Sequence, residues 1–311
     1  MTPSETQAIV TVSLLAAFVD GDKHERERAE IKRIAEGLAQ AEGVHLPTLY
    51  QDVLMKRVTL ASALPALAST EARQLAYEMA VCVCDADGAQ SAAEQAFLAE
   101  LGGALELDAS SAGRFTEQAE ALATVPLASP ASAAAPAVRA DDAELDAAIL
   151  NAAIVNGALE LLPETLSTMA IIPLQMKLVY HLGKAHGYEL DRGHVKDFLA
   201  TAGVGLTSQY LEQAGRKLLG GLLGRMGGGL LRGVGNQAVS SGMSFAATYA
   251  LGHVAKRYYA GGRVLSAQML KDAHASLTQE AQGLQTQHLP AIRERARTLD
   301  AGKVLAMVRG A

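Results

Sequence analysis

The sequence contains no tryptophan, and aromatic residues make up only 4% of its 311 positions. Hydrophobic residues still account for 50% of the chain, and they are mainly Ala, Leu and Val. This composition favours helices, because aromatic residues, which favour strands, are scarce while Ala and Leu are abundant. The chain is therefore predicted to be all-α, and its length allows two domains.

Cysteine is almost absent as well. Cys82 and Cys84 are the only two, and they lie two positions apart in an apolar run. A disulfide between them would strain the backbone, and two thiolates cannot complete a structural zinc site. We expect buried, reduced thiols of the kind found in cytoplasmic proteins. The first residues, with Ser4-Glu5-Thr6 before an apolar run, also lack the basic region of a secretory signal, so a cytoplasmic location is expected.

The motifs of common enzyme classes are missing too. The sequence has no HExxH, nucleophile elbow, CxxC or GxxxxGK[ST] pattern. Residues 233–238 loosely fit a dinucleotide-binding pattern, but no strand-like run precedes them and no acidic residue follows at the required distance. His181, His186 and His194 are expected to be polar surface or core-edge histidines. We predict a protein that is not an enzyme, with no catalytic residue, nucleotide or organic cofactor.

Acidic residues are absent from one long segment. Between Gln213 and Lys271 there is no Asp or Glu, but there are eight Lys or Arg and 13 of the 29 glycines, although the whole chain has a net charge of −6. Such a segment favours contact with phospholipid head groups or an acidic partner protein. Its cations are too widely spaced for a typical nucleic-acid surface. The side chains expected to face a membrane or partner are Arg216, Lys217, Arg225, Arg232, Lys256 and Arg257.

Small residues recur at intervals of four within this segment. One stripe comprises Gly220, Gly224 and Gly228, and another comprises Ala238, Gly242, Ala246 and Ala250. Residues four apart share a helix face, so the stripes predict closely packed helices. The uncharged stretch 233–255 is also long enough to cross a bilayer, and 165–183 is a second apolar stretch. A buried hairpin, a reversibly inserted helix and a permanent span remain open alternatives.

The stretch 123–140 divides the chain. It contains three of the nine prolines, many Ala and Ser residues and few charges, which is typical of an extended linker. We therefore predict two helical-bundle domains, residues 1–122 and 141–311, joined by an Ala/Pro/Ser-rich linker.

The first region contains an internal repeat. Residues 17–38 align with residues 84–105, so that Asp20-Gly21 matches Asp87-Gly88 and Glu27 matches Glu94. A buried helix that ends in Asp-Gly, with a Glu seven residues after the Asp opening the next helix, resembles the tellurite-resistance TerB-like domain. The resemblance covers roughly residues 5–122, and it implies a duplicated helical bundle.

The acidic turns of the repeat offer two interpretations. Their carboxylates could bind a hard cation such as Ca²⁺ or Mg²⁺. The candidate ligands are Asp20, Asp22, Glu27, Asp85, Asp87 and Glu94. Alternatively, they mark helix starts, because Ser91-x-x-Glu94 has the form of a capping box and acidic side chains favour helix N-termini.

The second region is similar to the YcjF-like family of membrane-associated proteins. The resemblance rests on the order of several landmarks: Leu161-Leu162-Pro163, Ile171-Ile172-Pro173, the Gly-rich run 220–235 and Arg257-Tyr258-Tyr259. It implies a helical domain at the inner membrane, peripheral or integral, without an activity that can be transferred.

These resemblances favour a non-enzymatic scaffold or adaptor in envelope or metal-oxyanion stress. We expect a homo-oligomer that contacts an anionic membrane surface or a partner protein. Two alternatives are a pore-forming or membrane-remodelling protein, which requires inserted helices, and a divalent-cation sensor, which requires the acidic turns.

Overall fold

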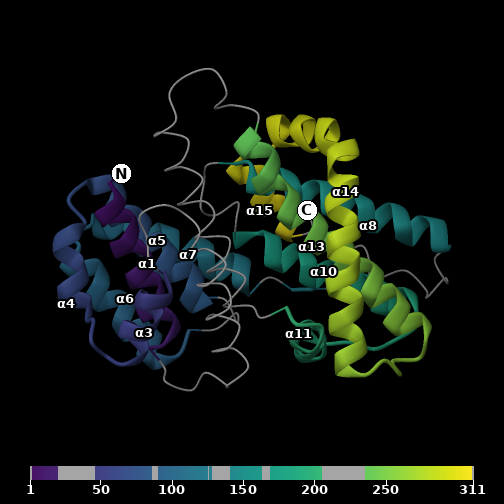
Figure 1. Cartoon of the computed structure of the whole chain (residues 1–311), viewed down its shortest axis with the longest axis horizontal. Helices are drawn as coiled ribbons and strands as arrows, with labels where there is room; N and C mark the ends of the chain where they lie inside the picture. Colours follow the sequence, from purple (N-terminus) through teal and green to yellow (C-terminus); the bar gives the residue numbers. More distant parts are fainter. Residues whose placement is uncertain are drawn as a thin grey trace. The chain divides into compact units, whose positions relative to one another are not determined.

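The computed structural model describes residues 2–19, 46–85, 90–124, 126–127, 141–162, 169–204 and 235–309. Every regular element in these ranges is a helix, which confirms the predicted all-α class (Figure 1). The described residues divide into two compact units, one within Met1–Thr124 and the other within Val125–Val204 and Leu230–Ala311. We call the described residues of the first the N-terminal unit and those of the second the C-terminal unit. Most of the predicted linker lies outside the described residues, and the domain limits stay predictions.

The N-terminal unit is built around its first helix. Its elements are α1 (Pro3–Ala17), α3 (Leu46–Leu54), α4 (Leu60–Ala63), the 3-10 helix η1 (Leu64–Ala66), α5 (Thr70–Cys84), α6 (Ala92–Ala104) and α7 (Ala109–Ala123). Helix α1 packs against α5 most extensively and also against α3, α4 and η1. Nearly all of its described side chains are buried, which explains why its sequence is apolar on every side rather than on one stripe.

The helix limits extend the internal repeat. The offset that aligns residues 17–38 with 84–105 also aligns the first residue of α1 with that of α5, and the last residue of α1 with that of α5. The N-caps correspond as well, since Thr2 caps α1 and Ser69 caps α5 through their hydroxyl groups. At the same offset α3 falls within α7. The two equivalent helices, α1 and α5, also pack directly against each other.

The C-terminal unit is built around a later helix. It comprises α8 (Asp142–Glu160), α10 (Ile171–Ala185), α11 (Arg192–Thr201), α13 (Gly235–Ala260), α14 (Ala267–Thr298) and α15 (Ala301–Arg309). Helix α13 packs against α14, α8 and α10, and α14 also contacts α8 (Figure 1). The central helix of this unit thus comes from the segment without acidic residues.

Helices α8 and α13 approach each other closely at a glycine. A Cβ atom added to Gly252 would lie 2.7 Å from Ile149 Cγ2 and 2.8 Å from Ile149 Cγ1, closer than carbon atoms approach without a shift. Ala246 and Ala250 of the predicted stripe are fully buried on the same helix. The side chains of Ala238 and Gly242, and the whole stripe 220–228, lie outside the described residues.

Within the described residues, no helix combines the length and the apolar character needed to cross a membrane. Parts of both predicted spans, 165–168 and 233–234, lie outside those residues. In α10, Lys177 is half-buried, and burial lowers the pKa of its ammonium group. The described residues therefore give no support to a permanent span.

Candidate functional site

The acidic turn of the second repeat is described at its two edges. Ser91 Oγ accepts a hydrogen bond from the backbone N–H of Glu94 at 3.2 Å, and Glu94 Oε2 accepts one from the N–H of Ser91 at 2.8 Å. This is the predicted capping box at the start of α6, and both side chains serve the helix end. Asp85 Oδ1 accepts a hydrogen bond from Gln90 Nε2 at 2.9 Å.

These contacts bear on the predicted cation site. Both Asp85 and Glu94 are buried. No cluster of His, Cys, Asp and Glu in the described part of the chain has an arrangement that could hold a metal ion. The other four predicted ligands, Asp20, Asp22, Glu27 and Asp87, lie outside the described residues. Glu94 takes part in the start of α6, whereas Asp85 lies at the end of α5 and accepts a hydrogen bond from Gln90. Cation binding stays a prediction.

A third buried carboxylate joins the starts of two helices. Glu5 belongs to a capping box at α1, where its Oε2 accepts a hydrogen bond from the N–H of Thr2 at 2.6 Å. Its Oε1 accepts two more from Ser69, one from the hydroxyl at 2.6 Å and one from the N–H at 2.9 Å. The side-chain bond from Ser69, with the backbone bonds from Thr2 and Ser69, lowers the pKa of Glu5 to about 2.

This contact makes the two repeats unequal. Thr2 and Ser69 are equivalent N-caps, and the single carboxylate of Glu5 bonds to both. The position of Glu5 in the second repeat is taken by Ala72, which is buried. Thr2-x-x-Glu5 can be recognised in the sequence as a capping box, but no sequence signal shows that Ser69 lies within reach.

The core of the C-terminal unit contains a neutral polar cluster. Thr248 Oγ1, on α13, accepts hydrogen bonds from Asn156 Nδ2 of α8 at 2.9 Å and from Gln175 Nε2 of α10 at 3.0 Å. None of the three residues is more than 1% exposed. The cluster therefore fixes α8, α10 and α13 relative to one another through one hydroxyl group. The amide oxygens, Asn156 Oδ1 and Gln175 Oε1, have no hydrogen-bond partner in the described residues.

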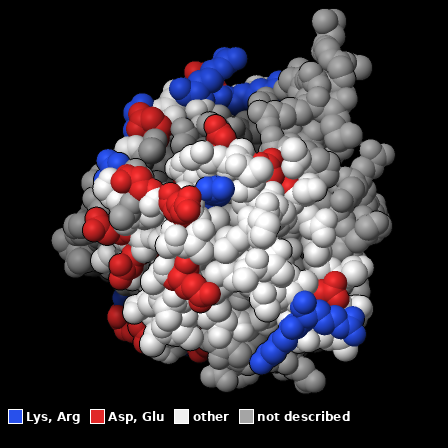
Figure 2. All heavy atoms as spheres, turned by 90° about the vertical axis from the view of Figure 1, so that its left-hand side faces the viewer, with Lys and Arg blue, Asp and Glu red and all other residues white. Residues whose placement is uncertain are grey.

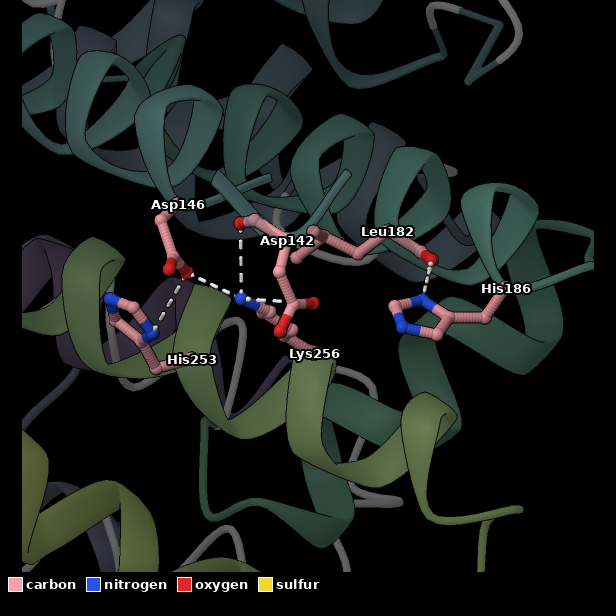
Figure 3. A network of polar contacts seen from close by, with 6 residues as sticks. All are labelled: Asp142, Asp146, Leu182, His186, His253 and Lys256. Carbon is pink, nitrogen blue, oxygen red and sulfur yellow. Dashed lines mark hydrogen bonds and ion pairs between the residues drawn. The ribbon is translucent and has the colours of Figure 1, made fainter. Parts of the chain in front are cut away.

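A network of charged groups joins α13 to the first turns of α8 (Figure 3). The Lys256 ammonium lies 2.7 Å from Asp146 Oδ1 and 3.3 Å from Asp142 Oδ1, and it donates a hydrogen bond to the carbonyl of Asp142 at 3.2 Å. His253 Nδ1 lies 3.8 Å from the same Asp146 oxygen. The Lys256 side chain is only 13% exposed. This predicted membrane-facing cation is therefore held by carboxylates of its own unit.

Two histidines of this unit are disfavoured as cations. Burial lowers the pKa of His253, and the charge of Asp146 opposes this effect only in part. Burial also lowers the pKa of His274 on α14, whose Nε2 atom has no hydrogen-bond partner in the described residues. His186 and His194 each have a local hydrogen-bond partner, the carbonyl of Leu182 and the Asp191 carboxylate respectively. They are core-edge and surface groups, as predicted.

Aromatic rings surround one arginine at the turn between α13 and α14. The guanidinium of Arg263 lies 5.7 Å from the ring centre of Tyr188 and 6.0 Å from that of Tyr258. Phe198 of α11 lies against Tyr258, with ring centres 5.2 Å apart. This cluster was not predicted, because its members come from three separate stretches of sequence.

The remaining predicted cations fall in two groups. Arg257 is exposed on the last turn of α13. Arg216, Lys217, Arg225 and Arg232 lie outside the described residues. On the face shown in Figure 2, Asp and Glu lie mainly towards the left, and Lys and Arg lie among them and also at the top and the lower right, around a mainly uncharged area. That face therefore carries no extended field of one sign.

Comparison with known proteins supports part of the sequence interpretation. Neither the curated proteins nor the solved structures include a match to this chain. The predicted YcjF-like character of residues 141–311 stays a prediction. Both cysteines are buried and outside any disulfide, as expected. Residues 6–116 match the family model described as Tellurite resistance protein TerB, and the N-terminal unit is TerB-like.

Proposed function

We propose that the protein is a non-enzymatic adaptor in the response to tellurite or related metal-oxyanion stress, acting at an anionic membrane surface as a homo-oligomer. The observation that carries the proposal is the TerB match over residues 6–116. The C-terminal unit supplies the attachment to the membrane, and the N-terminal unit supplies the surface for partner proteins.

The chemistry of the described polar groups supports an adaptor role. The carboxylates of Glu5 and Glu94 are engaged at helix starts, and the hydroxyl of Thr248 joins three helices. These groups stabilise helix packing, as expected for a protein whose surfaces rather than a pocket carry its function. No observation in the described residues favours pore formation or cation sensing over this role.

Tolerance of tellurite in a sensitive bacterial host tests the proposal. The full chain is expected to raise the minimum inhibitory concentration of tellurite above that of the empty vector. Leu101→Asp places a charge at a fully buried position of α6, so it is expected to unfold the N-terminal unit and to abolish protection. Gly283→Ala, at an open position of α14, is the matched control and is expected to protect normally.

Protein amounts are compared by immunoblotting, and folding of each purified variant is checked by circular dichroism. Equal tolerance with the full chain and with the empty vector would contradict the proposed stress role. Full protection by an unfolded Leu101→Asp variant would show that the TerB-like unit is not responsible.

A further inference from the structure

The turn between α13 and α14 exposes apolar side chains. Val264, within the turn, is 78% exposed, and Met269, in the first turn of α14, is 54% exposed. Large apolar side chains with this exposure are uncommon in the described residues, where Leu54 and Met55 are the other examples. We call residues 257–271, which contain the turn and the adjoining ends of both helices, the α13–α14 tip.

Three exposed cations accompany these apolar groups. Arg257, Arg263 and Lys271 are all exposed, and the tip contains no Asp or Glu. Lys256, by contrast, is directed at the carboxylates of α8. The tip therefore combines positive charge with apolar surface, whereas the neighbouring cation is neutralised inside the unit.

The backbone of the tip holds an arginine where glycine would be easier to accommodate. Gly262 and Arg263 both have positive φ, at 78° and 65°. The N–H of Arg263 donates a hydrogen bond to the carbonyl of Tyr258 at 2.8 Å, which fixes this conformation. The guanidinium remains exposed beside Tyr188 and Tyr258. A side chain kept at a strained position is a reason to look for a function.

We propose that the α13–α14 tip is a docking site for an anionic lipid surface. Arg257, Arg263 and Lys271 bind the phosphate groups, while Val264 and Met269 enter the boundary between head groups and acyl chains. Tyrosine beside arginine suits the same boundary, because its ring is apolar and its hydroxyl polar. Charge complementarity selects anionic lipid as the occupant. This inference rests on the membrane attachment in the proposed function and specifies its site.

Sedimentation with vesicles tests the site in the full-length protein. Vesicles of phosphatidylcholine alone are compared with vesicles that also contain phosphatidylglycerol. The wild type is expected to bind the anionic vesicles, more weakly as salt concentration rises, and to bind the neutral vesicles at least about tenfold less well.

Three sets of substitutions separate the contributions of the exposed cations, the apolar side chains and Arg263 to vesicle binding. Arg257→Glu with Lys271→Glu is expected to weaken binding at least about tenfold, because each basic residue near an anionic surface contributes appreciably. Val264→Asp with Met269→Asp is expected to weaken it at least about fivefold through lost apolar burial. Arg263→Gly relieves the backbone and removes one cation, so binding should fall while the thermal unfolding midpoint stays near that of the wild type.

The matched control is Arg295→Glu with Arg297→Glu, a double charge reversal at exposed positions near the other end of α14. It is expected to retain more of the binding than the reversal at the tip. Equal losses in the two reversals would indicate attraction by net charge and would overturn the assignment of the site. Circular dichroism of every variant separates loss of binding from loss of folding.

Two further outcomes would overturn the inference. One is a wild type that does not sediment with anionic vesicles, and the other is folded tip variants that bind like the wild type. Either result leaves the tellurite tolerance test unaffected, because tolerance is measured independently with the Leu101→Asp variant. Failure of the docking site and failure of the stress role can therefore be distinguished.

Discussion

The two units use buried polar groups in different ways. In the N-terminal unit, the charged carboxylate of Glu5 lies at the starts of α1 and α5, where helices present unpaired N–H groups. In the C-terminal unit, the neutral groups of Asn156, Gln175 and Thr248 lie between three helices, and charges such as Lys256 lie near the edge. The buried charge lies where backbone N–H donors are available, whereas neutral side chains make the deep contact between the sides of the helices.

The two units are also expected to lose stability at different pH values, because their buried titratable groups differ. Because the pKa of Glu5 is lower in the folded chain, its contribution is present above pH 4.5 and is lost as the pH falls towards 2. His253 and His274 also have lowered pKa values, but they are bases, so protonation below pH 6.5 favours the unfolded C-terminal unit. These groups therefore weaken the C-terminal unit first on acidification.

The largest expected effect comes from removal of the hydroxyl shared by three helices. Thr248→Val leaves the amide nitrogens of Asn156 and Gln175 without their acceptor and should cost about 3 kcal/mol. Urea unfolding measures the loss, and hydrogen exchange by mass spectrometry shows which unit is weakened. Thr278→Val, which removes only a bond to the helix carbonyl of His274, is the control and should cost under about 1 kcal/mol.

A loss in the N-terminal unit after Thr248→Val would contradict the comparison of the two units. Replacement of all three residues, with leucine at the two amide positions, should recover most of the stability, because it leaves no orphaned polar group.

Glu5→Gln is expected to have the next largest effect. It removes the charge that accepts bonds from Thr2 and Ser69 and should cost about 2 kcal/mol at pH 7. Between pH 4.5 and pH 3 the wild type should lose stability towards the level of the variant, because Glu5 gains a proton there when it unfolds. Urea unfolding at the three pH values measures this. A constant difference would show that the pKa of Glu5 is not lowered by these bonds.

A pair of glycine substitutions tests the close contact in the C-terminal unit. Gly252→Ala brings a methyl group against Ile149, and this overpacking should outweigh the gain in helix propensity, giving a net loss of about 1 to 2 kcal/mol. Gly283→Ala, with nothing within 4 Å of the new methyl group, should gain about 1 kcal/mol. Thermal and urea unfolding compare the two variants. If both stabilise the unit, α8 and α13 can separate at no cost.

The smallest expected effect is in the charged network. Asp146→Asn removes the carboxylate that partly offsets the effect of burial on His253, so the pKa of His253 should fall further. Stability should change by less than about 1 kcal/mol, because Asp146 is 50% exposed and water screens its interactions. An NMR titration of the histidine side chains provides the measurement. A rise in the pKa of His253 would contradict the contact seen in Figure 3.

Particular residues show how far the sequence could be interpreted. Patterns within one turn or one helix are enough to predict the capping box of Ser91 and Glu94 and the burial of Cys82 and Cys84. They also predict α5 and α6, the helices before and after Asp87-Gly88. Lys256 shows the limit. A cation in a segment without acidic residues suggested an outward side chain, whereas its carboxylates are supplied by α8, more than 100 residues earlier in the chain.

The all-α class, the repeated helical design of the TerB-like unit and the separation of acidic from basic segments could be predicted from the sequence alone, because composition, spacing and capping act over short stretches of chain. Three contacts could be seen only in the folded chain: Glu5 joins two helix starts, Thr248 joins three helices, and Gly252 meets Ile149. Such contacts depend on which helix faces meet, and packing of the whole unit sets that choice.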